Sequence, residues 1–202
     1  TPYAQQALAA FNNTPPDDIT LRLMESSRTL LPRVLGKEAS QQMLDAAERA
    51  ALKKSDDPWI ALTYARMLMD AEQYDKAVSV LDGVLNQPKM SVSLAATLQP
   101  IAQIAAFGER VDASLFAAER AENKQEWIKR ADEYMKQFEA AASADDAASV
   151  KLRRAKVAMM NENYASAIRD LSDLEQLGLA EAVEIKYMIG VCLFQQGNFG
   201  GA

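Results

Sequence analysis

The sequence predicts an all-α protein, and three observations lead to that prediction. Alanine, a strong helix former, is abundant, whereas Gly and Pro number only 8 and 7 among 202 residues. Apolar residues recur at helical spacing, and no stretch shows the period-two alternation that is typical of strands. The breaks between periodic segments are short, roughly two to four residues, which predicts that consecutive helices pack antiparallel as hairpins.

The individual helices follow from their start and stop signals. Three Asp-Asp pairs stand before apolar-periodic segments, where a carboxylate can accept first-turn amide hydrogens; these pairs are Asp17-Asp18, Asp56-Asp57 and Asp145-Asp146. Pro58 would then occupy the first position of its helix, whereas Pro32 and Pro100 are expected to kink or end theirs. The predicted helices are 3–12, 18–31, 38–53, 58–71, 74–87, 91–107, 112–142 (with a break near Asn123 as an alternative), 147–160, 164–176, 181–196 and one that starts at 198.

Composition excludes several classes of function. The formal charge of −6 and the pI near 4.8 disfavour binding to nucleic acid or to anionic membrane surfaces. No run approaches the roughly 18 apolar residues of a membrane span. With no His and only Cys192, the common zinc, haem and copper sites and every His-based acid or base are excluded within these residues, so no cofactor is expected. A single Cys forms no internal disulfide, and the cellular compartment stays open.

Three stretches share one pattern of small and aromatic residues at equal spacing. They are Ala65-x-x-Leu68 with Tyr74-x-x-Ala77-x-x-x-Leu81-x-x-Val84, Ala155-x-x-Ala158 with Tyr164-x-x-Ala167-x-x-x-Leu171-x-x-Leu174, and Gly190-x-x-Leu193 with Gly197-x-Phe199-x-x-Ala202. A small residue in the first helix lets the second helix approach closely, the aromatic residue fills the corner, and the following Ala admits the next repeat. The spacing of the last two stretches is close to a repeat of about 34 residues.

This pattern resembles the tetratricopeptide repeat (TPR) family over residues 57–88, 147–180 and 181–202. The Trp that the family carries in its first helix is replaced here by Ala61, Lys151 and Lys186. The resemblance implies an α-solenoid of antiparallel helical hairpins, a TPR-like superhelix.

The same resemblance implies a single helical-repeat domain over residues 1–202. Residues 18–54 have the length of a degenerate hairpin, and residues 90–146 exceed one repeat and are expected to form atypical long helices. Residues 181–202 form an incomplete repeat, because Ala202 falls within its expected second helix, and the chain is expected to be a fragment of a longer one.

Two further patterns have alternative interpretations. Residues 90–146 carry Phe107, Leu115 and Phe116, and then Trp127, Ala131, Tyr134 and Phe138 at spacings of four, three and four. This apolar stripe is predicted to be one face of a long helix or, alternatively, a coiled-coil or partner-binding seam. The basic cluster from Lys151 to Lys156 either receives an acidic peptide or another subunit's negative patch, or forms a solvated helix face balanced by Asp145, Asp146 and Glu162.

In the TPR family, first-helix side chains line a concave groove that binds peptides. The resemblance implies that groove residues here are Trp59, Leu62, Arg66, Met69, Leu152, Lys156, Met159, Tyr187, Val191 and Phe194. This mixed apolar and basic set suits an extended or helical peptide with apolar anchors and some negative charge. The Lys and Asn set with which some members bind acidic chaperone tails is absent.

These observations predict a non-catalytic scaffold that binds a protein or peptide partner. The alternative is self-assembly into a homo-oligomer through helices of the 112–142 stretch. A third class, an enzyme or a lid domain of one, stays open because carboxylates, Tyr and Lys can catalyse reactions without His.

Overall fold

The described part of the molecule is entirely helical. The computed structural model describes residues 5–6, 8–9, 25–26, 28, 30–53, 57–86, 94–177 and 182–198, and no strand occurs among them. The all-α class is therefore confirmed. Of the predicted helix at 3–12 only residues 5–6 and 8–9 are described, and they are helical, whereas most of the one at 18–31 and all but Asn198 of the one starting at 198 lie outside the described residues. The chain divides into two compact units, Thr1–Ala106 (unit 1) and Phe107–Ala202 (unit 2).

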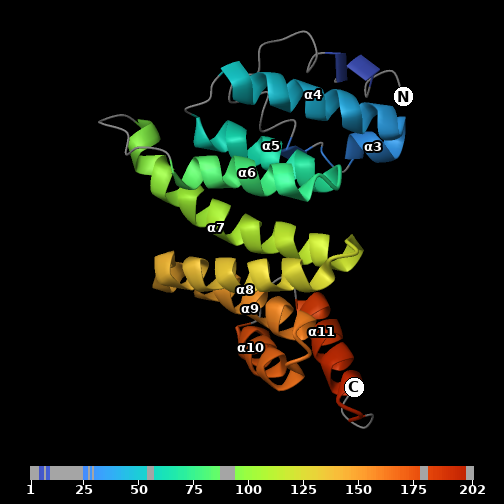
Figure 1. Ribbon diagram of the computed structural model, residues 1–202, viewed down its shortest axis with the longest axis vertical. Coiled ribbons are helices and arrows are strands. Elements are labelled where there is room, and N and C mark those ends of the chain that lie inside the picture. Colours follow the sequence, from blue (N-terminus) through green and yellow to red (C-terminus); the bar gives the residue numbers. More distant parts are fainter. Residues whose placement is uncertain are drawn as a thin grey trace. The chain divides into compact units, whose positions relative to one another are not determined.

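Unit 1 is built on helices that pack sequentially (Figure 1). They are α3 (Leu30–Leu35), α4 (Lys37–Lys53), α5 (Pro58–Asp70), α6 (Tyr74–Leu85) and the first part of α7 (Leu94–Arg120). α4 contacts α3 and α5, and α5 contacts α6. Met43, Ile60 and Leu68 lie in the core that α4 and α5 share, whereas Leu62 and Leu81 lie in a second cluster with α7 alanines.

Local signals explain where α5 begins and how α3 accommodates a proline. Asp57 caps α5 as predicted, because its carboxylate accepts the amide hydrogens of Trp59 and Ile60 at 2.9 and 3.3 Å. Pro58 is the first residue of α5, where its missing amide hydrogen costs nothing. Pro32 does not end a helix as expected. It is the third residue of α3, in the first turn, where no intrahelical amide bond is lost.

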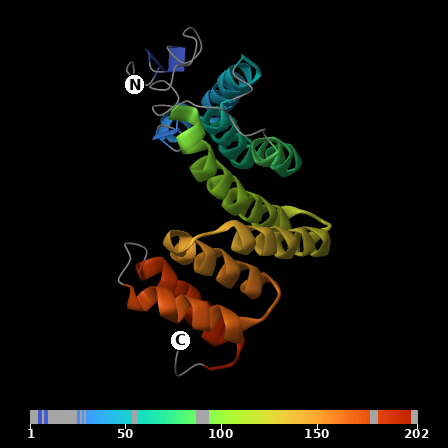
Figure 2. The ribbon, with the colours of Figure 1, turned by 90° about the vertical axis from the view of Figure 1, so that its left-hand side faces the viewer.

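Among its described residues, unit 2 contains the rest of α7 and five further helical elements (Figure 2). They are α8 (Lys124–Ala141), the short 3-10 helix η1 (Ala144–Asp146), α9 (Ala147–Met160), α10 (Tyr164–Gln176) and α11 (Ala182–Gln195). α9 contacts both α8 and α10, and α10 contacts α11. The core of these last three helices includes Ala155, Leu171 and Ile185, each at most 1% exposed.

α7 differs from the prediction. The expected end at 107 and new start at 112 do not occur, since one helix runs from Leu94 to Arg120 through both Pro100 and Gly108. Each of these residues weakens a helix locally, but the buried neighbours Ala106 and Val111 anchor α7 on both sides of the expected break. The break near Asn123, offered as an alternative, is present between α7 and α8.

Three turns in the two units have the same backbone geometry. Glu72, Glu162 and Gly197 adopt positive φ angles of 60°, 59° and 75°. In each turn the next residue donates its amide hydrogen to the carbonyl five positions earlier; these bonds are Gln73 to Leu68, Asn163 to Ala158 and Asn198 to Leu193, at 2.8 to 2.9 Å. This is the Schellman motif, in which a left-handed residue ends a helix. The turns coincide with the three predicted repeats, and two of them hold Glu where Gly would be unstrained.

The start of α9 is organised differently from the predicted Asp cap. The carboxylate of Asp146 accepts hydrogen bonds from the amide and the hydroxyl of Ser143, at 2.9 and 2.7 Å, instead of capping α9 directly. These bonds hold the pKa of the Asp146 carboxyl below its usual range. The Asp17-Asp18 pair lies outside the described residues.

Candidate protein-interaction surface

The basic cluster on α9 is used inside unit 2. Each of its four cations bonds to a carboxylate on another helix: Lys151 to Asp173 at 2.6 Å, Arg153 to Asp112 at 2.7 Å, Arg154 to Asp170 at 2.5 Å and Lys156 to Glu184 at 3.5 Å. The partners come from α7, α10 and α11, and Glu139 of α8 adds a contact to Arg154 at 3.2 Å. The cluster therefore joins α9 to its neighbours. Both interpretations from the sequence are therefore wrong. The cluster is not a vacant site for an acidic peptide, and it is not a solvated face balanced by Asp145, Asp146 and Glu162.

The Arg154–Asp170 pair is the most buried of these contacts. Asp170 is only 6% exposed, and both of its carboxylate oxygens accept hydrogen bonds from the Arg154 guanidinium, at 2.7 and 2.5 Å. This bidentate geometry satisfies a carboxylate that burial would otherwise penalise. The same bonds raise the pKa of Arg154 above its ordinary value, so its guanidinium stays charged.

The Arg153 side chain packs against the backbone of α7 at Gly108, where a larger residue would clash with it. Its guanidinium donates to the carbonyl oxygen of Gly108 at 3.0 Å, bonds to Asp112 and to the Ser149 hydroxyl, and lies over the Phe138 ring at 5.6 Å. A Cβ atom on Gly108 would lie 2.9 Å from Arg153 Cζ. Gly108 therefore admits the Arg153 head group against the backbone of α7, which no local sequence signal indicates.

The predicted groove residues fall into three groups. Leu62 is fully buried in unit 1, in a cluster with Leu81 and Val84, so its prediction as a partner-contacting residue is wrong. A second group is half-buried or bonded internally; its members are Arg66, which pairs with Glu25 at 3.2 Å, Met69, Leu152, Lys156, Met159 and Val191. Only a third group is exposed, and it consists of Trp59 on α5 with Tyr187 and Phe194 on α11.

α11 carries the most exposed apolar surface of unit 2. Val183, Tyr187 and Phe194 are 83%, 72% and 58% exposed and recur at helical spacing, with Gly190 between them. The opposite side of the helix, with Ile185, Met188 and Cys192, is buried against α10 and α9. We call Val183, Tyr187, Gly190 and Phe194 the α11 face. Sequence reasoning selected Tyr187 and Phe194 but missed Val183.

The stripe residues spaced by four, three and four lie on one helix, as predicted, since Trp127, Ala131, Tyr134 and Phe138 all belong to α8. Phe107, Leu115 and Phe116 belong to α7. Leu115, Trp127, Ala131 and Phe138 are at most 5% exposed, while Tyr134 lies beneath the Arg110 guanidinium, 3.9 Å from it. Because most of the stripe is inside unit 2, it does not supply the contact surface that a coiled-coil or self-assembly seam needs.

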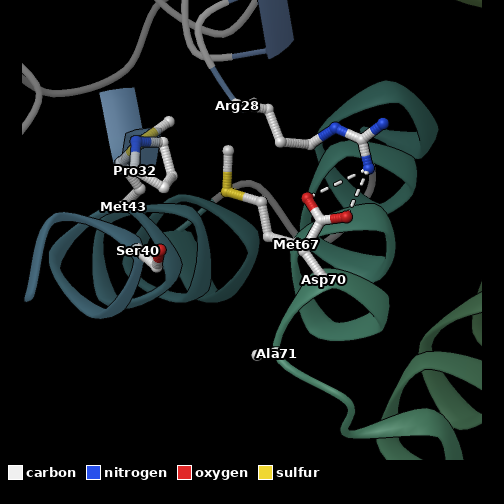
Figure 3. Close-up of a pocket in the computed structure, with 7 residues that line it drawn as sticks. All are labelled: Arg28, Pro32, Ser40, Met43, Met67, Asp70 and Ala71. Atoms are coloured by element: carbon white, nitrogen blue, oxygen red, sulfur yellow. Dashed lines mark hydrogen bonds and ion pairs between the residues drawn. The ribbon is translucent and has the colours of Figure 1, made fainter. Parts of the chain in front are cut away.

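Unit 1 contains a small pocket that the sequence did not predict (Figure 3). Its volume of about 40 Å³ holds only a few water molecules. Arg28 donates two hydrogen bonds to the Asp70 carboxylate at its rim, at 3.0 and 3.1 Å, beside Met43 and Met67. Burial raises the pKa of Asp70, and the neighbouring Arg28 opposes that rise. The ion pair lies on one side of the pocket, and Ser40 is also among the residues that line it.

The described residues lack two other kinds of site. They hold no group of three or more Cys, Asp or Glu side chains arranged to bind a metal ion. None of the helices in this part of the chain combines the length and the apolarity that crossing a bilayer requires. No protein-family model matches the chain, and no curated protein or solved structure is significantly similar to it.

Proposed function

We propose that this chain is a non-catalytic helical-repeat scaffold of the TPR-like kind, which binds a protein partner. The observation that carries the proposal is the α11 face, where three large apolar side chains are more than half exposed on one helix. Contiguous exposed apolar surface is characteristic of interaction sites. An all-helical solenoid presenting such a surface acts by shape and burial and needs no chemistry of its own.

Two features support the repeat interpretation. The three Schellman turns recur at the places where the sequence pattern sets its aromatic anchor, after Glu72, Glu162 and Gly197. The small residues Ala65 and Ala155 are both fully buried, as close approach between paired helices requires. The charged cluster of α9 is used in internal ion pairs, which leaves the apolar α11 face as the better candidate for partner binding.

Site-specific photo-cross-linking tests this function. A benzophenone amino acid replaces Tyr187 in one variant and Leu52 in another, and both are irradiated in cells that express the chain naturally. Leu52 is a matched control because it is 77% exposed but lies on α4 of unit 1. We expect a discrete adduct with another protein from position 187 and none from position 52. Equal adducts from both positions would contradict the proposal, and an adduct of twice the chain mass would favour self-assembly instead.

A further inference from the structure

A short stretch of chain before α3 is held on α5 by ion pairs. Glu25 lies 3.2 Å from Arg66, and Arg28 donates two hydrogen bonds to the Asp70 carboxylate, at 3.0 and 3.1 Å. Arg66 and Asp70 are four positions apart on α5, and Glu25 and Arg28 are three positions apart, so each pair presents its two charges about one helical turn apart. We call Glu25 and Arg28 the latch, and Arg66 and Asp70 the seat.

The latch is attached by charge more than by close packing. A pocket of about 40 Å³ lies beside it and is lined, among others, by Arg28, Pro32, Met43 and Met67 (Figure 3). The Oε2 atom of Glu25 is enclosed and has no hydrogen-bond partner among the described residues. Closely packed protein interiors contain few such gaps and unpaired atoms. The latch and seat side chains are 27% to 47% exposed, and ion pairs with that exposure contribute little to stability.

Gly36 is the single residue between α3 and α4, and it determines how the two helices meet. Its φ angle of 85° is left-handed, while the space around it is open, because an added Cβ atom would meet nothing within 4 Å. Glycine is therefore favoured there by the backbone angle and not by a close neighbour. If Gly36 took helical angles, α3 and α4 would form one continuous helix over 30–53, and the latch, which precedes α3, would leave the seat.

Two large apolar side chains would move together with the latch. Leu30 and Val34 lie one turn apart on α3 and are 60% and 46% exposed. In a dimer that exchanges its latches, the two connecting segments cross at the twofold axis next to Gly36. Leu30 and Val34 of one copy would then lie against those of the other, which buries apolar surface that the single chain leaves exposed.

We propose that this chain dimerises by exchanging its latch, so that Glu25 and Arg28 of one copy bind the seat of the other. The occupant is a second copy because the latch is the segment whose charges fit the seat. Exchange keeps these ion pairs and changes only the angles at a one-residue hinge, which is the usual requirement for domain swapping. The α11 face takes no part, so the inference stands apart from the proposed binding of a protein partner.

A charge exchange between two variants of the 202-residue chain tests the proposal. Arg28→Glu and Asp70→Arg each place like charges on latch and seat, whether the latch binds its own chain or an identical copy. In a mixture, the unchanged Arg28 of one variant meets the unchanged Asp70 of the other, and the two substituted side chains also attract each other. Light scattering over a concentration series is expected to show a one-to-one dimer whose dissociation constant is about tenfold lower, or more, than that of either variant alone.

The hinge is tested by a matched pair of glycine substitutions. Gly36→Ala is expected to lower the dissociation constant of the dimer about tenfold or more, because alanine disfavours left-handed angles and favours a helix. Gly83→Ala makes the same change inside α6, where an added Cβ also meets nothing within 4 Å, and should leave dimerisation unchanged. Val34→Glu in the Gly36→Ala chain should weaken the dimer again by a similar factor. Circular dichroism and thermal unfolding establish that each variant is folded.

Three results would overturn the inference. They are a mixture of the folded charge variants that stays monomeric, dimers that form equally well in either charge variant alone, and a Gly36→Ala chain that dimerises no more than the Gly83→Ala chain. None of these results depends on cross-linking from position 187. Failure of the latch exchange is therefore distinguishable from failure of the proposed scaffold function.

Discussion

The α5–α6 pair in unit 1 and the α9–α10 pair in unit 2 share one backbone plan but are stabilised in different ways. Both have a Schellman turn with a left-handed Glu, and both bury the same small residue of the first helix. The positions around that small residue differ. Leu62, Thr63 and Tyr64 are buried in α5, whereas their equivalents in α9 are the half-buried Leu152 and the ion-paired Arg153 and Arg154.

This comparison separates the requirements of the turn from those of the helix faces. The hydrogen bonds of the turn and the small residue recur because the path of the chain depends on them. The helix faces that contact neighbouring helices can be stabilised either by buried apolar side chains or by ion pairs, provided that each buried charge has a hydrogen-bonding partner. Unit 1 should therefore respond most to the loss of apolar volume, and unit 2 to the loss of charge.

The largest expected effect is that of Leu62→Ala. Removing a fully buried leucine side chain should lower the free energy of unfolding of unit 1 by about 3 kcal/mol. Leu152→Ala, at the equivalent half-buried position, should cost about 1 kcal/mol in unit 2. Urea unfolding with hydrogen exchange resolved by helix measures both losses. Equal losses would mean that the two pairs are packed alike.

Arg154→Met is expected to have the next largest effect. It leaves the buried Asp170 carboxylate without its cation, and the expected loss in unit 2 is about 2 kcal/mol. A fully buried pair would lose more, but the Arg154 side chain is 44% exposed. In a Trp59→Phe background, Trp127 fluorescence reports on unit 2 alone. The double variant Arg154→Met with Asp170→Leu should recover most of the loss, and an unchanged loss would show that the ion pair is not its cause.

Stability is expected to be lost at alkaline pH in unit 1 and at acid pH in unit 2. Burial and the bond that Tyr64 donates to Glu48 raise the pKa of Tyr64 from 10.0 to about 12. Because the folded pKa is the higher one, this stability is complete below pH 10 and is lost as the pH rises towards 12. Tyr64→Phe should abolish that alkaline loss in a circular dichroism titration.

The loss of stability at acid pH is expected in unit 2. The bond from Lys151 lowers the pKa of the Asp173 carboxyl below 3.8. The stability from this pair is therefore complete above the unfolded pKa and is lost as the pH falls through the lower folded pKa. Lys151→Met should reduce the loss of stability at acid pH without changing the loss at alkaline pH. If the stability of this variant depended on pH as that of the unchanged chain does, the Lys151–Asp173 pair would not be the cause of the acid loss.

The smallest expected effect comes from a pair of glycine substitutions. Gly83→Ala should stabilise α6 by about 0.5–1 kcal/mol, because alanine has the higher helix propensity and its Cβ would meet nothing within 4 Å. Gly108→Ala should give no such gain, because its Cβ displaces the Arg153 guanidinium. In an Arg153→Met background the gain at position 108 should reappear in thermal unfolding. A gain at position 108 with Arg153 present would show that the glycine is not needed for this contact.

Much of the secondary structure could be predicted because its signals are local. Asp57 before Pro58 specifies the start of α5, and the three-residue breaks before Tyr74 and Tyr164 specify the starts of α6 and α10. The prediction failed between 107 and 112, where a break was expected but α7 continues through Gly108. A single glycine costs a helix only about 1 kcal/mol, which tertiary contacts readily exceed.

The candidate surface was only partly predictable. Tyr187 and Phe194 were predicted as groove residues and are exposed, but Leu62 was predicted with them and is buried. A repeat pattern assigns the same position in each unit, whereas exposure depends on whether a following helix covers that position. Sequence spacing alone does not contain that information.

The sequence by itself determined the helical class, most helix boundaries and the three equivalent turns, because each depends on residues within about one or two helical turns of each other. Only the tertiary structure decided the fate of the charged and apolar faces. Arg153 meets Asp112 across 41 positions and Arg154 meets Asp170 across 16. Such contacts depend on how whole helices pack. Packing placed the basic cluster of α9 in ion pairs with neighbouring helices, and the apolar face of α11 is exposed.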